Sequence, residues 1–118
     1  MRVSELLRWQ WKGYPRYHRS RVNLLVHIGA VPRFLVGNVG VVLSLSRGAW
    51  LLSLVWAAAV VVSLALQGRG HRLEALPPEP FTSPLNALSR IFCEQWVTFP
   101  RFVLSGGWLG ALRNASPR

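Results

Sequence analysis

The sequence contains no aspartate, a single lysine (Lys12) and a single cysteine (Cys93) among its 118 residues. Without aspartate a Ser-His-Asp triad is impossible, and a glutamate version would have to be assembled from distant parts of the chain. The chain has no P-loop lysine, and Gly68-Arg-Gly70 lacks the preceding strand and third glycine of a dinucleotide fingerprint. One cysteine excludes an internal disulfide and a thiolate zinc site, so Cys93 is expected to be a small buried apolar residue.

Acidic residues are scarce as well: four glutamates face 13 arginines and one lysine, for a net charge of +10. Such a charge fits either nucleic acid or an anionic lipid surface. The apolar share is 51% and the mean hydropathy is +0.27, and residues 49–66 form one uncharged run of 18. That run favours membrane lipid as the partner, and no nucleic-acid partner is expected. Residues 1–12 lack the apolar core of a signal peptide, so none is expected.

The hydrophobic pattern predicts one all-α, integral membrane domain over residues 1–118, built on a two-helix transmembrane hairpin. Interfacial amphipathic helices are expected at both ends of this hairpin. The expected segments are a basic, aromatic interfacial segment at 1–22, membrane helices at 23–46 and 49–67, a site loop at 68–83 and amphipathic helices at 84–113.

Local signals set the expected boundaries. Ser4 is a candidate N-cap for the first helix, which should break near Gly13 and Pro15, and Pro32 should kink the first membrane helix. Ser83 and Pro84 should open the C-terminal helix, and Pro100 should end it. Residues 46–48 read as a tight turn between the two membrane helices.

Positive charge gathers at the open end of the expected hairpin, in Arg2, Arg8, Lys12, Arg16, Arg19, Arg21, Arg69 and Arg72. Only Arg47 marks the turn. The positive-inside rule therefore predicts that both termini are cytoplasmic. His18 and His71 would lie on that same side, so the hairpin itself would bring them together.

The three histidines predict a metal site at the membrane surface. Asn23 and His27 are four residues apart and share one helical face, and His71 and Glu74 are three apart. His18 would have to sit on a bend to join His27. Two or three histidines with a carboxylate are the ligand set of non-haem iron enzymes, with zinc as an alternative ion. The competing interpretation is that the histidines only form hydrogen bonds.

The same interpretation leaves the glutamates in simple ion pairs. Glu74 would pair with Arg69 or Arg72, and Glu94 would pair with Arg90 at i,i+4.

Two motifs resemble a known family, the 2-hydroxy-palmitate dioxygenase-like family of integral membrane proteins. The first is spaced H-x4-N-x3-H-x4-P and consists of His18, Asn23, His27 and Pro32. The second is Q-x-x-G-H followed by a glutamate and a proline, and here consists of Gln67, Gly70, His71 and Glu74. The resemblance covers roughly residues 14–80, and the block at 90–101 is similar to a short bacterial subgroup, which implies a bacterial inner membrane.

The resemblance implies an iron(II)-dependent dioxygenase that shortens 2-hydroxy fatty acids by one carbon (α-oxidation) with dioxygen. It implies that His18, His27 and His71 are metal ligands and that Glu74 is a further ligand or supports one. Asn23 and Gln67 would orient the ligands. Among the arginines, Arg69 and Arg72 are the best placed for the carboxylate of the fatty-acyl substrate.

Two other classes of function stay open on the sequence alone. The chain fits a non-enzymatic membrane scaffold or lipid-binding protein, whose arginines anchor anionic lipid. It also fits a haem-binding subunit with histidine axial ligands. Exposed apolar helix faces make a homo-oligomer possible.

Overall fold

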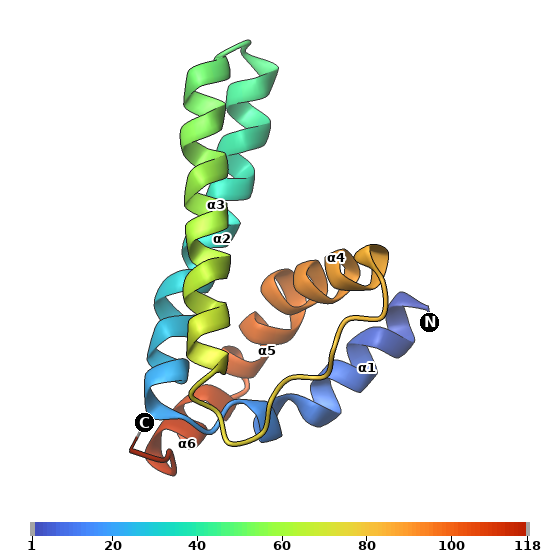
Figure 1. The fold of residues 1–118 in the computed structure, drawn as a ribbon, viewed down its shortest axis with the longest axis vertical. Coiled ribbons are helices and arrows are strands. Elements are labelled where there is room, and N and C mark those ends of the chain that lie inside the picture. Colours follow the sequence, from blue (N-terminus) through green and yellow to red (C-terminus); the bar gives the residue numbers. More distant parts are fainter. Residues whose placement is uncertain (1, 118) are drawn as a thin grey trace.

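The computed structural model describes residues 2–117 and is helical throughout (Figure 1). Its elements are α1 (Val3–Gly13), the 3-10 helix η1 (Tyr14–Tyr17), α2 (Arg21–Ser46), α3 (Trp50–His71), α4 (Pro84–Cys93), the π-helical turn η2 (Glu94–Thr98), α5 (Phe99–Leu104) and α6 (Gly107–Arg113). Residues 2–117 contain no strand, only an isolated bridge between Ser20 and Ser116. The all-α prediction is confirmed.

Helices α2 and α3 lie side by side and run in opposite directions, joined by residues 47–49 (Figure 1). Gly48 makes the turn with a φ of 70°, a left-handed conformation that suits glycine. The helices approach closely at Gly37 and Gly40, where a Cβ would collide with Val60 and with the ring of Trp56. Small residues at such crossings let two apolar backbones pack tightly.

The half of this pair nearest the turn stands clear of the other helices (Figure 1). Its surface is apolar and exposed, as at Trp50 (69% exposed) and Leu51 (81%). Both helices are long and apolar enough to cross a membrane. At 1.5 Å per residue, the 22 residues of α3 extend about 33 Å, close to the ~30 Å of a hydrocarbon core.

The remaining helices gather beside the other half of the pair (Figure 1). There the buried core consists of Tyr14, Leu24, Val31, Phe99 and Phe102. Trp108 in α6 donates its indole N–H to the carbonyl of Leu24 over 2.9 Å, which fastens the C-terminal helices to α2. The well-packed part of the molecule is therefore the end of the helix pair opposite the turn, where α2 begins and α3 ends.

Most local boundary signals agree with the structure. The first helix breaks at Gly13 with Pro15 inside η1, and Ser83 caps α4 by accepting a hydrogen bond from the Asn86 N–H over 3.0 Å. Ser4 is not an N-cap, because α1 begins one residue before it, after Arg2.

Three helix boundaries differ from the prediction. Helix α2 begins at Arg21 rather than at residue 23, and α3 continues to His71 instead of ending at 67. Pro100 does not end the C-terminal helix; it follows a π-turn and lies in the first turn of α5. The predicted site loop at 68–83 is therefore confined to residues 72–83.

Candidate metal centre

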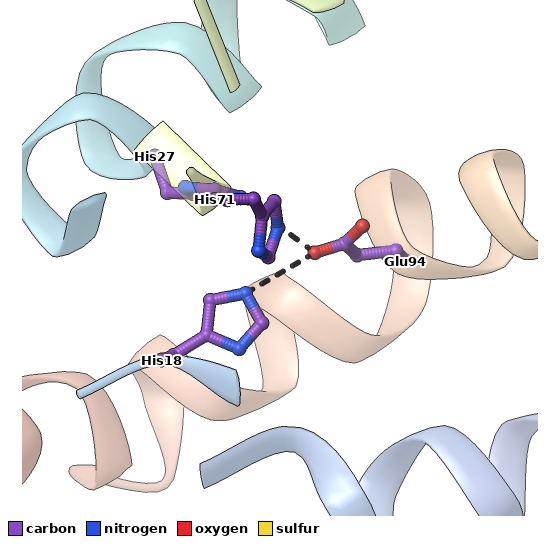
Figure 2. A group of neighbouring side chains, drawn as sticks. All are labelled: His18, His27, His71 and Glu94. Atoms are coloured by element: carbon purple, nitrogen blue, oxygen red, sulfur yellow. Dashed lines mark ion pairs between the residues drawn. The ribbon is translucent and has the colours of Figure 1, made fainter. Parts of the chain in front are cut away.

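The three histidines come from three separate elements and meet at one point (Figure 2). His18 follows η1, His27 lies in the second turn of α2, and His71 is the last residue of α3. The ring centroids are 5.1 Å apart for His18 and His27, and each lies 4.9 Å from His71. The antiparallel packing of α2 and α3 brings the last two together, because the start of α2 lies beside the end of α3.

Glu94 approaches the histidines from η2 (Figure 2). Its Oε2 atom lies 3.6 Å from Nε2 of His18 and 3.8 Å from Nε2 of His27. One ligand atom from each of these four residues lies within 4.8 Å of all the others. His18, His27, His71 and Glu94 therefore form a group that can hold a metal ion.

Hydrogen bonds set the tautomers of two of these histidines. Nδ1 of His18 lies 2.8 Å from the carbonyl of Tyr14, and Nδ1 of His27 lies 2.9 Å from the carbonyl of Asn23. Because a carbonyl oxygen only accepts, each Nδ1 carries the proton and each Nε2 presents a lone pair. Metal-binding histidines are oriented in this way in other proteins.

The buried nitrogens without hydrogen-bond partners are the strongest indication that this group can hold a cation. Nε2 of His18, Nε2 of His27 and Nδ1 of His71 are buried and have no hydrogen-bond partner among residues 2–117. Burying a polar atom without a hydrogen bond costs about 1–3 kcal/mol, and here three such atoms belong to rings whose centroids lie 4.9–5.1 Å apart. A shared cation would satisfy all three at once.

The spacing and chemistry of the four ligands fit a first-row metal ion. Two ligand atoms held at about 2.0–2.2 Å from a metal are at most about 4.4 Å apart, so the observed spread of up to 4.8 Å needs a small contraction. Imidazole nitrogen with carboxylate oxygen suits Fe(II) or Zn(II), and the absence of a thiolate disfavours soft ions such as Cu(I).

The charge state of Glu94 suits a ligand. Burial raises the pKa of this carboxyl, but the imidazoles of His18, His27 and His71 outweigh burial and lower its pKa to about 2. Tyr14 donates its phenol O–H to Oε2 of Glu94 over 2.7 Å. Burial, and then the charge and hydrogen bond of Glu94, raise the Tyr14 pKa well above 10, so this phenol remains a donor.

Glu74, predicted as a ligand, lies outside the group, and Glu94 occupies the place of the carboxylate. Glu74 is 8% exposed and accepts hydrogen bonds from the backbone N–H groups of Arg19 (2.8 Å) and Ser20 (3.1 Å) and from the Asn23 amide (2.6 Å). It thus holds the stretch that carries His18. The displacement follows from α3 ending at His71, since beyond that residue the chain no longer keeps helical phase.

The predicted ion pairs of the two glutamates do not form. Among residues 2–117 no ion pair joins Glu74 to an arginine. Arg90 donates to the carbonyls of Glu79 (2.8 Å) and Pro80 (3.0 Å) rather than to Glu94. Its guanidinium also lies over the ring of Phe81, so Arg90 fastens the proline-rich connector to α4.

The two predicted orienting residues are buried beside the ligands. Asn23 binds Glu74 with its side chain and His27 with its carbonyl. Gln67 exchanges two hydrogen bonds with Gln95, at 2.9 and 2.7 Å.

A cavity of about 360 Å³ reaches the group and is lined there by His18, His71 and Glu94. Its walls are largely apolar, with Trp9, Leu64, Phe81 and Ile91, and it also includes Arg16 and Arg90. Arg69 and Arg72, predicted to hold a substrate carboxylate, do not line this cavity. They border a separate hollow with Val22, Val26 and Leu66.

Sequence reasoning missed three residues of the site: Glu94, Tyr14 and Gln95. A signal was present, because Glu94 and Gln95 interrupt a largely apolar stretch at residues 91–99. No family model matches the sequence, and comparison with curated proteins and with solved structures finds no similar chain.

Proposed function

We propose that this protein is a membrane-bound, non-haem iron(II) dioxygenase that acts on 2-hydroxy fatty acids and shortens them by one carbon. The observation that carries the proposal is the convergence of three unpartnered imidazole nitrogens and the Glu94 carboxylate beside one cavity. The two motifs that resemble the dioxygenase family supply His18, His27 and His71, and they support the choice of reaction.

The membrane assignment is supported by the exposed apolar surface of α2 and α3. Arginines lie at the open end of the helix pair, which would sit at an anionic membrane surface with both termini on the cytoplasmic side. In this arrangement the four ligands lie near the interface. A fatty acid dissolved in the bilayer would then present its polar head at the depth of the metal site.

The residues of the site have separate tasks in this proposal. When bound, iron supplies the redox chemistry that activates dioxygen and the positive charge that attracts the hydroxy-carboxylate. The carbonyls of Tyr14 and Asn23 keep protons on Nδ1 of His18 and His27, which leaves each Nε2 free. Glu74 fixes the backbone after His18.

The cavity suits an amphiphilic acid. Its volume falls within the range of small-molecule sites, and its walls offer Trp9, Leu64 and Phe81 to an acyl chain. Arg16 places a cation in the lining, which makes it a better candidate for the substrate carboxylate than Arg69 or Arg72. Arg90 already donates to two backbone carbonyls.

Oxygen consumption tests the reaction. Detergent-purified protein loaded with Fe(II) should consume dioxygen with a 2-hydroxy fatty acid and release the acid that is one carbon shorter. The unsubstituted fatty acid of equal length and the His71→Ala protein are the controls, and both should be inactive. Iron-loaded protein that leaves 2-hydroxy acids of several chain lengths unchanged would contradict this function.

A haem-binding role is less well supported by the same geometry. The three rings meet edge to face with centroids 4.9–5.1 Å apart, which leaves no slot for a macrocycle between two of them. Purified protein is therefore expected to lack a Soret band. A scaffold without a reaction would need no cavity that ends at unpaired imidazoles.

A further inference from the structure

Glu94 owes its place in the metal centre to an irregular piece of helix. The N–H of Phe99 donates to the carbonyl of Glu94, a bond five residues back that defines the π-turn η2. Pro100 has no N–H to continue regular α-helical bonding at this point. A π-turn carries one extra residue and changes the phase of the side chains, and such turns are common at functional sites.

A buried amide pair fastens this turn to the helix that carries His71. Nε2 of Gln67 donates to Oε1 of Gln95 over 2.9 Å, and Nε2 of Gln95 donates to Oε1 of Gln67 over 2.7 Å. Gln67 also donates to Ser63, whose hydroxyl donates to the carbonyl of Ala30. Hydrogen bonds thus run without interruption from α2 through α3 to η2.

The position of this pair in the chain explains its effect on the ligands. Gln67 lies one helical turn before His71, on the same face of α3, and Gln95 directly follows Glu94. Gln95 is 1% exposed and Gln67 is 5% exposed. Removing either amide would leave the other buried and unsatisfied, so the pair fixes the distance between the two ligand-bearing elements.

Tyr14 holds the carboxylate of Glu94 from the other side. Its phenol O–H donates to Oε2 over 2.7 Å, while its backbone carbonyl accepts from Nδ1 of His18. The Tyr14 ring also stacks on the His18 ring, with centroids 3.8 Å apart and planes 15° from parallel. One residue therefore orients two members of the metal group.

The Glu94 side chain has a competing direction. Arg16 lines the same cavity, and a carboxylate released from Tyr14 could turn toward this cation. Without these restraints the free side chain would also lose rotamer entropy on binding a metal.

We infer that Tyr14 and the Gln67–Gln95 pair are positioning residues that hold the Glu94 carboxylate as the fourth ligand of the metal centre. The inference rests on the metal centre of the proposed function, but it does not depend on the substrate. Hydrogen-bond partners of metal ligands typically contribute 10–100-fold to metal affinity. Tyr14→Phe and Gln95→Leu should therefore each lower the affinity about 10–100-fold.

Matched controls separate positioning from general packing. Tyr17→Phe removes a phenol that donates to Glu79 over 3.4 Å, outside the metal group. Ser83→Ala removes the N-cap of α4, so it destabilises the start of that helix without changing a hydrogen bond of η2. Both variants should bind metal like the wild type, even where Ser83→Ala lowers the melting temperature.

The experiment is a titration of metal-free, detergent-purified protein with Co(II), followed by visible absorption and by competition with a chelator. A double-mutant cycle of Tyr14→Phe with Glu94→Gln gives the decisive readout. If Tyr14 acts through Glu94, each single change lowers Co(II) affinity and the double variant loses little more than Glu94→Gln alone. Additive losses, or an unchanged affinity in Tyr14→Phe, would overturn the inference.

The outcomes also distinguish this inference from the proposed function. Wild-type protein that binds no Co(II) would refute the metal centre itself. Wild-type binding together with unchanged binding in Tyr14→Phe would refute only the positioning role. Because Gln95→Leu removes a buried partner and can unfold the protein, Tyr14→Phe, which keeps the stacked ring, carries the test by itself.

Discussion

Asn23 donates its side-chain amide to Glu74 over 2.6 Å, joining the first turn of α2 to the chain just beyond α3. Residues 51 positions apart are thereby fixed beside the metal group. Glu74 receives further hydrogen bonds from the backbone of Arg19 and Ser20, which follow His18 directly. This carboxylate therefore acts on the site through the backbone on which His18 is placed.

Glu74→Gln should lower both stability and metal affinity. The amide keeps one acceptor oxygen but turns a donor toward groups that are themselves donors, so at least one buried hydrogen bond is lost at a cost of about 1–3 kcal/mol. Thermal unfolding measured with and without Co(II) checks this prediction. Glu79→Gln, which changes an exposed carboxylate, is the control and should leave both quantities unchanged.

Gly70→Ala should destabilise the protein, whereas Gly68→Ala should not. A Cβ on Gly70 would collide with the Asn23 side chain, while a Cβ on Gly68 meets no atom within 4 Å. Overpacking of this kind costs about 1–3 kcal/mol. In Gly68→Ala the better helix propensity of alanine stabilises by up to about 1 kcal/mol. Equal melting temperatures for the two variants would contradict the close packing of α3 against Asn23.

Metal affinity should fall on acidification, because protons compete with the metal for the imidazole nitrogens. Each imidazole that must lose a proton to bind the metal lowers the affinity by up to about tenfold per pH unit once the pH falls below its pKa. The pKa of Glu94 is lowered to about 2, so this carboxylate stays ionised at mildly acidic pH and contributes no pH dependence there. Co(II) titrations at several pH values measure the slope, and an affinity that stays constant on acidification until the protein unfolds would contradict imidazole ligands.

Labelling in membranes should place the two ends of the helix pair on opposite sides. In a Cys93→Ser background, a cysteine at Ser46, beside the turn, and one at Ser116 should differ in reaction with a membrane-impermeant maleimide. Intact cells should label only Ser46→Cys, because the arginines at the other end favour the cytoplasmic side. Labelling of both positions in intact cells, or of Ser116→Cys alone, would contradict the expected orientation.

The helices could be predicted closely from the sequence because their signals are local. The uncharged run at 49–66, the turn around Gly48 and the cap at Ser83 each depend on neighbouring residues only. The first membrane helix forms as one element with Pro32 inside it, as the prediction of a single helix over 23–46 requires. Packing against α3 offsets the hydrogen bond that proline removes there.

The site was only partly predictable, for a physical reason. The three histidines could be predicted to lie together because, in an antiparallel pair, the start of the first helix lies beside the end of the second. Glu94 reaches them through a π-turn, which changes side-chain phase by an amount that no periodic pattern records. Glu74 follows His71 by three residues, which would place both side chains on one face of a continuous helix. Helix α3 ends at His71, so the two side chains do not share a helical face.

Metal content is the measurement that tests the central claim most directly. Wild-type protein, His71→Ala and Glu94→Gln should be purified in detergent under identical conditions and analysed by mass spectrometry for iron and zinc, with Glu79→Gln as the control. We predict about one equivalent of a first-row metal in the wild type and in Glu79→Gln. His71→Ala and Glu94→Gln should retain a small fraction of it. Equal metal content in all four proteins, or none in any of them after reconstitution with Fe(II), would contradict the account.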